Sequence, residues 1–299
     1  MHIGLIGCGR WGQLILQTLT RLSVSVSVCD LSNEHCRQAL ALGAVKATPT
    51  IEPFGSVDGL IVATPASTHR AVLEQLASFG KPIFIEKPLA TSYEDALAIE
   101  RLALPPTFMM HIWRYHPGVQ MLGDIGWSGK IGQVLLLKTS RTNWTSPRVD
   151  TDSLRTLAPH DLTIILQILG YIPTPKSAVA ERHNGQIRSL TAFLGSNPAC
   201  VIEVSTRYAD KRREIRVHGT EGVAVLADEQ TNAVDIWYGD DQTSIANRRH
   251  ERLFFDSTPP LQLELMAFLT YLRGGPAPLS PLSEGVEITR LIDVLDQLA

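Results

Sequence analysis

The sequence predicts an α/β domain with a parallel sheet at residues 1–118 and an α+β domain with a large, mainly antiparallel sheet at residues 119–299. Two observations lead to this prediction. Up to about residue 118, apolar strand-like runs alternate with helix-like segments, as they do in parallel sheets. Beyond residue 131, strand-like runs follow one another through short turns such as Asn184-Gly185, which is typical of an antiparallel meander.

Composition limits the partners to be expected. A chain of 299 residues favours about two domains, and a net charge of −3 gives no reason to expect nucleic acid or an anionic membrane. No apolar stretch is long enough for a membrane span, and the first strand begins at once, which leaves no room for a signal peptide. The four cysteines lack the spacing of a metal site or a disulfide framework. We therefore expect a reducing, cytoplasmic location and no bound metal.

A glycine-rich turn directly follows the first predicted strand. Gly7, Gly9 and Gly12 form the pattern G-x-G-x-x-G between an apolar run that ends at Ile6 and helical spacing over residues 14–19. In a dinucleotide site, the first glycine makes the tight turn, the second lets a pyrophosphate approach, and the third allows close packing of helix on strand. The helix N-terminus then holds the phosphate charge. The pattern alone is weak, but its strand–turn–helix setting predicts a Rossmann nucleotide site.

Asp30 follows the second predicted strand, residues 24–28. A carboxylate at this place accepts hydrogen bonds from the adenosine ribose and repels a 2′-phosphate, which favours NAD over NADP. The alternative is a turn or N-cap residue, because residues 31–34 open the next helix.

Two further loops are expected at the same edge of the sheet. The strand at 57–63 runs into residues 64–69, and the strand at 83–85 delivers residues 86–88. Ligands of doubly wound folds bind at the carboxyl ends of the strands. The residues expected to contact the dinucleotide are Gly7, Gly9, Arg10, Trp11, Gly12, Asp30, Ala63, Thr64, Pro65, His69, Glu86 and Lys87.

The remaining elements complete the two domains. Helices are expected at 34–42 and 93–102 and a strand at 107–112, and the second half opens with a strand at 134–140 and a helix at 161–169. Further strands are expected at 176–182, 187–194, 199–208, 213–218, 222–227 and 233–238, and further helices at 261–272 and 283–298. A large sheet commonly hides its open face against a partner, so we expect a homodimer or homotetramer.

Beyond the glycine turn, the chain resembles the glucose–fructose oxidoreductase / inositol dehydrogenase (Gfo/Idh/MocA) family. The resemblance covers most of the chain, and the stretch 148–170 is similar to a branch that acts on amino sugars or sugar nucleotides. The motifs are IGCGRWG (6–12), ATPASTH (63–69), EKPLA (86–90), HIWRYHP (111–117), GKIGQV (129–134) and LAPHDLTIILQILG (157–170).

The resemblance implies a site for hydride transfer. Lys87 matches the lysine of the family's EKP motif, and His160 matches the histidine before the second-domain helix. A histidine titrates near working pH and suits a general base, and a lysine can stabilise charge on an alcohol oxygen. The alternatives are a helix-capping histidine and an exposed turn lysine.

The chain departs from the family pattern close to His160. The family's usual aspartate, four residues before the histidine, is replaced here by Thr156. The aromatic residue that usually precedes the aspartate is replaced by Arg155. A threonine cannot stabilise an imidazolium as a carboxylate does. Either His160 is a weaker base or another carboxylate supplies the charge; the candidates are Asp150, Asp152 and Asp161.

Arginine and aromatic side chains supply the candidate substrate residues. The sequence points to Arg114, Tyr115, Asn143, Arg148, Arg155, Thr156 and His160. Arginines suit a carboxylate or phosphate on a sugar, although surface solvation or an ion pair is an equal alternative. Trp113, Trp127 and Trp144 are expected to serve packing.

These observations together predict an oxidoreductase that transfers hydride between NAD, or less favourably NADP, and a secondary hydroxyl or ketone of a sugar or sugar derivative. Two alternatives stay open. One is a non-catalytic, regulatory nucleotide-binding member of the family. The other is a redox-neutral enzyme with tightly bound NAD.

Overall fold

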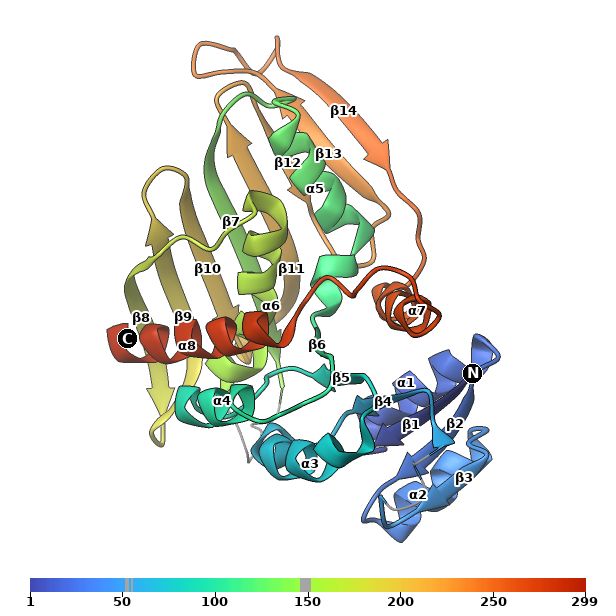
Figure 1. Ribbon diagram of the computed structural model, residues 1–299. Helices are drawn as coiled ribbons and strands as arrows, with labels where there is room; N and C mark the ends of the chain where they lie inside the picture. The colour runs from blue at the N-terminus through green and yellow to red at the C-terminus, as the bar shows by residue number, and fades with distance from the viewer. Residues whose placement is uncertain (52–53, 55, 146–151) are drawn as a thin grey trace. The chain divides into compact units, whose positions relative to one another are not determined.

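The computed structural model describes residues 1–51, 54, 56–145 and 152–299. The chain forms two compact units (Figure 1). Unit 1 contains residues 1–112 and 259–289, and unit 2 contains residues 113–258 and 290–299. The division expected at residue 118 thus differs from the observed one chiefly because the chain returns to unit 1 near its end.

Unit 1 contains a six-stranded sheet whose paired strands are all parallel, in the order β3-β2-β1-β4-β5-β6. This order is that of the doubly wound dinucleotide-binding fold and confirms the predicted α/β class. The strands are β1 (His2–Ile6), β2 (Ser25–Cys29), β3 (Lys46–Thr48), β4 (Gly59–Val62), β5 (Ile83–Glu86) and β6 (Thr107–Met110).

Helices connect the strands of this sheet. Each of α2 and α4 begins after a serine, Ser32 or Ser92, whose side chain accepts a hydrogen bond from a backbone N–H of the first turn. The helices of unit 1 are α1 (Arg10–Arg21), α2 (Asn33–Ala41), α3 (His69–Leu76), α4 (Tyr93–Glu100) and α7 (Pro260–Leu272), with short 3₁₀ turns η2 (Ala66–Thr68) and η3 (Ala77–Phe79).

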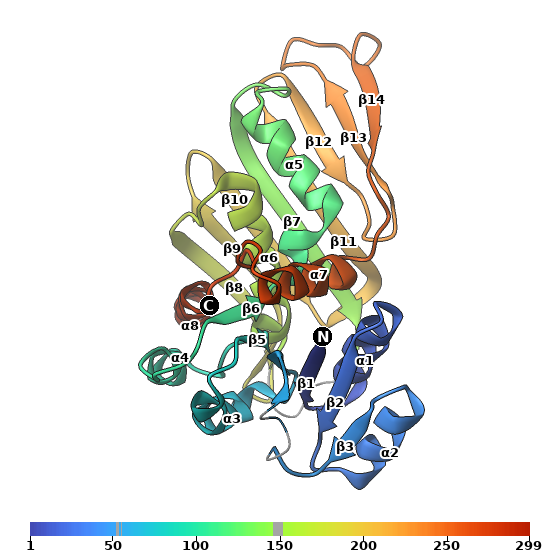
Figure 2. The ribbon, with the colours of Figure 1, turned by 45° about the vertical axis from the view of Figure 1, so that its right-hand side comes forward.

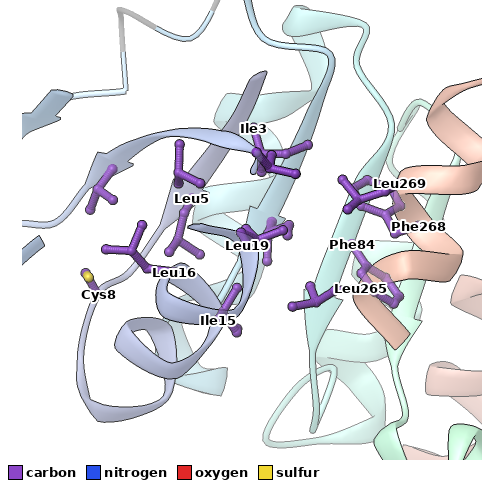
Figure 3. Packing of buried hydrophobic residues seen from close by; sticks show 14 of the residues in the cluster. Ile3, Leu5, Cys8, Ile15, Leu16, Leu19, Phe84, Leu265, Phe268 and Leu269 are labelled. Carbon is purple, nitrogen blue, oxygen red and sulfur yellow. The ribbon is translucent and has the colours of Figure 1, made fainter. Parts of the chain in front are cut away.

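Helix α7 joins the core of unit 1 from far along the sequence. Leu265, Phe268 and Leu269 belong to the same buried cluster as Ile3 of β1 (Figure 3). The ring of Phe268 stacks on Phe84 of β5 with the ring centroids 4.9 Å apart. Burial of such side chains is the main source of folding free energy, so α7 is part of this unit's core.

Unit 2 is built on an eight-stranded sheet in the order β14-β13-β12-β11-β7-β10-β9-β8. Only β7 and β10 pair in parallel among these strands, so the predicted mainly antiparallel sheet is confirmed. The strands are β7 (Val134–Trp144), β8 (Pro175–His183), β9 (Gln186–Gly195), β10 (Ala199–Ser205), β11 (Arg207–Gly219), β12 (Gly222–Leu226), β13 (Ala233–Tyr238) and β14 (Arg249–Phe254).

Two helices cover one face of this sheet, as both ribbon views show (Figures 1 and 2). Helix α5 (Pro117–Trp127) contacts β11, β12 and β13, and α6 (Ser153–Leu169) contacts β7, β9 and β10. The 3₁₀ turn η4 (Ile112–Tyr115) precedes α5, and α8 (Leu282–Leu298) contributes its beginning to unit 1 and its end to unit 2.

Helix α6 begins earlier than the expected residue 161. The side chain of Asp152 caps its first turn by accepting a hydrogen bond of 2.9 Å from Arg155 N. Pro159 lies inside the helix, where a proline usually ends one. The cap and the buried side chains of α6 outweigh the hydrogen bond that this proline cannot donate.

Candidate functional site

The glycine turn has the geometry of a dinucleotide cradle. Gly7 adopts a φ of +90°, a conformation open mainly to glycine. A Cβ atom on Gly12 would lie 2.2 Å from the carbonyl oxygen of Gly7, so only glycine lets α1 approach β1 this closely. A Cβ atom on Gly9 would meet nothing within 4 Å, which leaves open space over the turn. Arg10 and Trp11 follow as the first residues of α1.

Asp30 lies directly after β2 and is tied to the glycine turn. Its Oδ2 accepts a hydrogen bond of 2.6 Å from Cys8 N, and its Oδ1 accepts one of 2.8 Å from Ser32 N. The Nδ1 atom of His35 lies 3.1 Å from the same Oδ1. The carboxylate therefore stands at the carboxyl end of β2, the place of the ribose-binding acid in this fold.

The loop that follows β4 lies at the same carboxyl edge of the sheet as the glycine turn. Ala63 N donates a hydrogen bond of 2.7 Å to Ile6 O, which ties the start of the loop to the end of β1. Thr64, which follows, is half-buried, and Pro65 is exposed.

The expected contact of His69 with the dinucleotide needs correction. Its side chain is buried, with Nδ1 3.0 Å from Leu89 O and Nε2 3.0 Å from Thr64 O. Burial lowers the pKa of this imidazole. Both ring nitrogens face backbone carbonyls. His69 therefore contacts the loops that follow β4 and β5, and its ring nitrogens do not point towards a ligand.

The carboxyl end of β5 carries Glu86 and Lys87. The indole Nε1 of Trp11 donates a hydrogen bond to Oε1 of Glu86, and Lys87 N donates one of 3.0 Å to Oε2. Burial raises the pKa of Glu86 to about 7, although the Lys87 charge and these hydrogen bonds oppose the rise. Lys87 itself is half-buried. The hydrogen bond from Trp11 to Glu86 thus links the start of α1, next to the glycine turn, to the loop of residues 86–88.

Glu264 is a residue that the sequence reasoning missed. It lies on the buried face of α7 beside Leu265 and Phe268, fully enclosed, and neither carboxyl oxygen has a hydrogen-bond partner among the described residues. Burial, and to a lesser extent the charge of Glu86, raises its pKa well above the usual range. The only signal in the sequence was an acidic residue within a mostly apolar helix.

His160 and Thr156 lie four residues apart on α6, so both are on one face of the helix. Both side chains are half-buried. The hydroxyl of Thr163 donates a hydrogen bond of 2.8 Å to His160 O. The two residues are therefore neighbours on the helix, as their spacing predicts.

The carboxylates considered as helpers of His160 have other partners. Oδ2 of the buried Asp161 accepts a hydrogen bond of 2.9 Å from Nε of the buried Arg141. Asp152 caps α6 and pairs with Arg155 at 3.3 Å. Asp150 lies outside the described residues. The structure thus offers a structural role for two of the three candidates.

The other candidate substrate residues lie in different surroundings. Nε of Arg114 donates a hydrogen bond of 3.2 Å to Gln167 on α6, and Tyr115 is buried. Arg155 pairs with Asp293 and Asp296 of α8, both at 3.0 Å, so it joins α6 to the end of the chain. Asn143 is half-buried near the end of β7, and Arg148 lies outside the described residues.

Two of the tryptophans were wrongly expected to serve packing. Trp113 is buried, with the guanidinium of Arg141 4.2 Å from its ring centroid. Trp127 and Trp144 are instead largely exposed, because each stands at the outer end of its helix or strand.

No helix among the described residues combines the length and apolar character that crossing a membrane requires.

The strand order and the glycine turn identify unit 1 as a Rossmann domain of the NAD-binding type. Residues 1–104 match the model of the oxidoreductase family with an NAD-binding Rossmann fold, GFO_IDH_MocA. All of the matched residues lie in unit 1.

Relatives of the chain are named for sugar-like substrates. The UDP-N-acetylglucosamine 3-dehydrogenase of Acidithiobacillus ferrooxidans is 31% identical over 60% of this chain and 58% of its own length. An inositol 2-dehydrogenase of Rhizobium meliloti is 25% identical over 81% of this chain and 80% of its own. The match to the first relative thus spans less than two thirds of that protein.

Solved structures share the fold over the whole chain. The structure of the Acidithiobacillus ferrooxidans enzyme has a TM-score of 0.83 at 24% identity, covering 100% of this chain and 96% of that one. A levoglucosan dehydrogenase in complex with NADH and levoglucosan has a TM-score of 0.86 at 16% identity, covering 100% and 97%. At these identities the likeness shows the fold alone.

Proposed function

We propose that this protein is an NAD-dependent oxidoreductase that transfers hydride between the cofactor and a secondary hydroxyl or ketone of a sugar or sugar derivative. The observation that carries the proposal is the hydrogen bond from Trp11 to Glu86. Lys87 directly follows Glu86 at the carboxyl end of β5, so this bond supports a place for Lys87 near the glycine turn that we propose as the dinucleotide site. The sugar-like substrates in the names of the relatives support the substrate class.

The residues of the chain fit the cofactor. The open space over Gly9 admits a pyrophosphate, the N-terminus of α1 offers its N–H groups, and Asp30 stands where a ribose is held. When bound, NAD⁺ supplies the hydride acceptor. The protein must then handle the hydroxyl proton and orient the carbon.

Lys87 and His160 are assigned these tasks. As an ammonium, Lys87 donates a hydrogen bond to the substrate oxygen and stabilises the negative charge that develops on it. The imidazole of His160 would accept the proton of the substrate hydroxyl when the alcohol is oxidised. In the reverse direction, the same imidazolium returns the proton to the ketone oxygen.

The decisive experiment is NADH formation with a panel of inositols, UDP-amino sugars, anhydrosugars and sugar acids. We expect steady NADH accumulation with one class of compound. Lys87→Met and His160→Asn should each lower kcat/KM by at least about 100-fold. Lys46→Met, which changes an exposed lysine of β3, should not. NADH binding without turnover on any compound would instead support a regulatory protein.

One relative keeps a redox-neutral alternative open. The 2,7-anhydro-N-acetylneuraminate hydratase of Escherichia coli is 24% identical over 80% of this chain and 70% of its own length. A hydratase changes its substrate without a net gain or loss of electrons. Substrate consumption without NADH accumulation, followed by chromatography of the sugar, would identify such a reaction here.

We further propose that the protein forms a homodimer or homotetramer through the sheet face opposite α5 and α6. The strand register puts Val179, Phe193 and Phe254 on that face, and all three are largely exposed. Exposed apolar side chains on a broad sheet are typical of an interaction surface. Light scattering after gel filtration should give the mass of two or four chains, and Phe193→Lys should reduce it.

A further inference from the structure

The carboxylate of Asp30 already has most of its hydrogen-bonding capacity in use. Oδ1 receives Ser32 N at 2.8 Å and His35 Nδ1 at 3.1 Å, and Oδ2 receives Cys8 N at 2.6 Å. A carboxylate offers about four acceptor positions. One good position, on Oδ2, is therefore left for a ribose hydroxyl, and His35 occupies a place at which a second one could bind.

The contact with Asp30 also fixes which nitrogen of His35 carries the proton. An ionised carboxylate only accepts hydrogen bonds, so Nδ1 must be the donor. Nε2 is then the nitrogen that gains or loses a proton. The side chain is 39% exposed, and within the described ranges no hydrogen bond involves Nε2. His35 thus places a partly exposed imidazole next to the acid expected to select the ribose.

We propose that His35 is a specificity-determining residue for the dinucleotide: protonated, it admits the 2′-phosphate of NADP(H), and neutral, it leaves Asp30 to select NAD(H). The proposal rests on dinucleotide binding at the glycine turn, and it extends the proposed function to the choice between the two cofactors. A neutral His35 leaves one uncompensated negative charge at the ribose. An imidazolium cancels that charge and offers its Nε2–H to the phosphate.

Two thiols near the pair carry no charge over the pH range of the test described below. Cys8 of the glycine turn and Cys29 of β2 lie within electrostatic range of Asp30, and burial raises the pKa of each thiol to about 11. Both thus stay uncharged from pH 6 to 8.5. Cys36 of α2 directs its Sγ to Asp30 O. On the same helix, Glu34 and Arg37 form an ion pair with each other. Histidine is the side chain that changes charge in this range.

The test is a pair of binding titrations that needs no substrate. Dissociation constants of NADH and NADPH are measured through the fluorescence of the reduced nicotinamide, at steps from pH 6.0 to 8.5. For the wild type, we expect the ratio Kd(NADPH)/Kd(NADH) to rise by about tenfold between the two ends. His35→Gln keeps a donor for Asp30 without a titratable charge and should abolish most of this rise. His35→Arg should hold the ratio low throughout.

Two controls separate His35 from other causes. The 2′-phosphate itself titrates near pH 6, but it does so equally with every variant, so only the difference between variants is used. Arg37→Ala removes a positive charge from the same helix turn and should leave the pH dependence intact. If the ratio follows the same curve in wild type and His35→Gln, the proposal is overturned. If neither dinucleotide binds to the wild type, the proposed function fails as well.

Discussion

The indole Nε1 of Trp11 donates a hydrogen bond to Oε1 of Glu86, which joins the glycine turn to the loop that carries Lys87. These residues lie 75 positions apart, and each belongs to a motif recognised on its own in the sequence. The bond means that the ionisation of Glu86 and the conformation of the nucleotide cradle are coupled.

Replacing Trp11 should therefore shift a titration. The indole hydrogen bond stabilises the charged form of Glu86 and lowers its pKa, so Trp11→Phe should raise that pKa from about 7 by about one unit. The pH dependence of the NADH dissociation constant reports the shift. Trp127→Phe, at an exposed position of unit 2, serves as the control. An unchanged profile in Trp11→Phe would mean that Glu86 does not influence the cradle.

Glu264 should destabilise the protein increasingly as the pH rises. Its pKa is raised in the folded protein, so the folded state binds the proton more tightly than the unfolded chain. The penalty is absent below the unfolded-chain pKa, near 4.3, and grows as the pH rises towards the folded-state value. Glu264→Met should therefore increase the free energy of unfolding by about 1–3 kcal/mol at pH 8 and by less at pH 5. Urea unfolding at both pH values tests this, and an equal effect at the two would contradict it.

The buried pair of Arg141 and Asp161 should be costly to break from one side. Asp161→Leu or Arg141→Met leaves the other residue without its counter-charge, with an expected loss of about 3–5 kcal/mol of unfolding free energy. The double variant Arg141→Met/Asp161→Leu should recover a large part of it. Denaturant titration of the four proteins gives the coupling energy, which should be near zero if the pair is unimportant.

Two glycine substitutions should separate folding from binding. Gly12→Ala places a Cβ against the carbonyl oxygen of Gly7, so it should lower both the melting temperature and the NADH affinity. Gly9→Ala meets no atom within 4 Å, so it should melt like the wild type yet bind NADH at least about tenfold more weakly, because the methyl group occupies the space of the pyrophosphate. Scanning calorimetry and NADH titration distinguish the two effects.

Thr156 offers a test of how the base is tuned. Thr156→Asp places a carboxylate one helical turn from His160 on the same face. A nearby negative charge favours the imidazolium, so the acid limb of the kcat/KM profile for alcohol oxidation should move to higher pH by about one unit. Thr156→Ser is the neutral control. Identical limbs in wild type and Thr156→Asp would show that this position does not tune the base.

Local patterns predicted the parts of the structure that depend on neighbours in sequence. The turn at Gly7 and the position of Asp30 directly after β2 follow from a strand, a turn and a helix in succession. The start of α6 was predicted too late because Pro159 is a strong local signal against a helix. The cap at Asp152 and the burial of the first turns together stabilise the helix in spite of this proline. The small strand β3 and helix α5 carried too weak a pattern to be expected.

The parts that depend on distant residues were not predictable in this way. An acid at position 264 in an apolar helix resembles a surface residue until Phe268 is seen to stack on Phe84. His69 sits in a motif at the ligand edge, and only the burial of its ring shows that its nitrogens face backbone carbonyls. Arginine patterns gave no indication that Arg155 pairs with Asp293 and Asp296.

The late return of α7 has a consequence for how the protein is made. Leu265, Phe268 and Leu269 complete a core whose other members are synthesised within the first 110 residues. During translation, part of the apolar surface of the nucleotide-binding sheet therefore stays exposed until α7 has left the ribosome. A chain that stops before residue 260 would keep every strand of that sheet and would still expose the surface on which Phe268 packs, which makes it a natural target for chaperones.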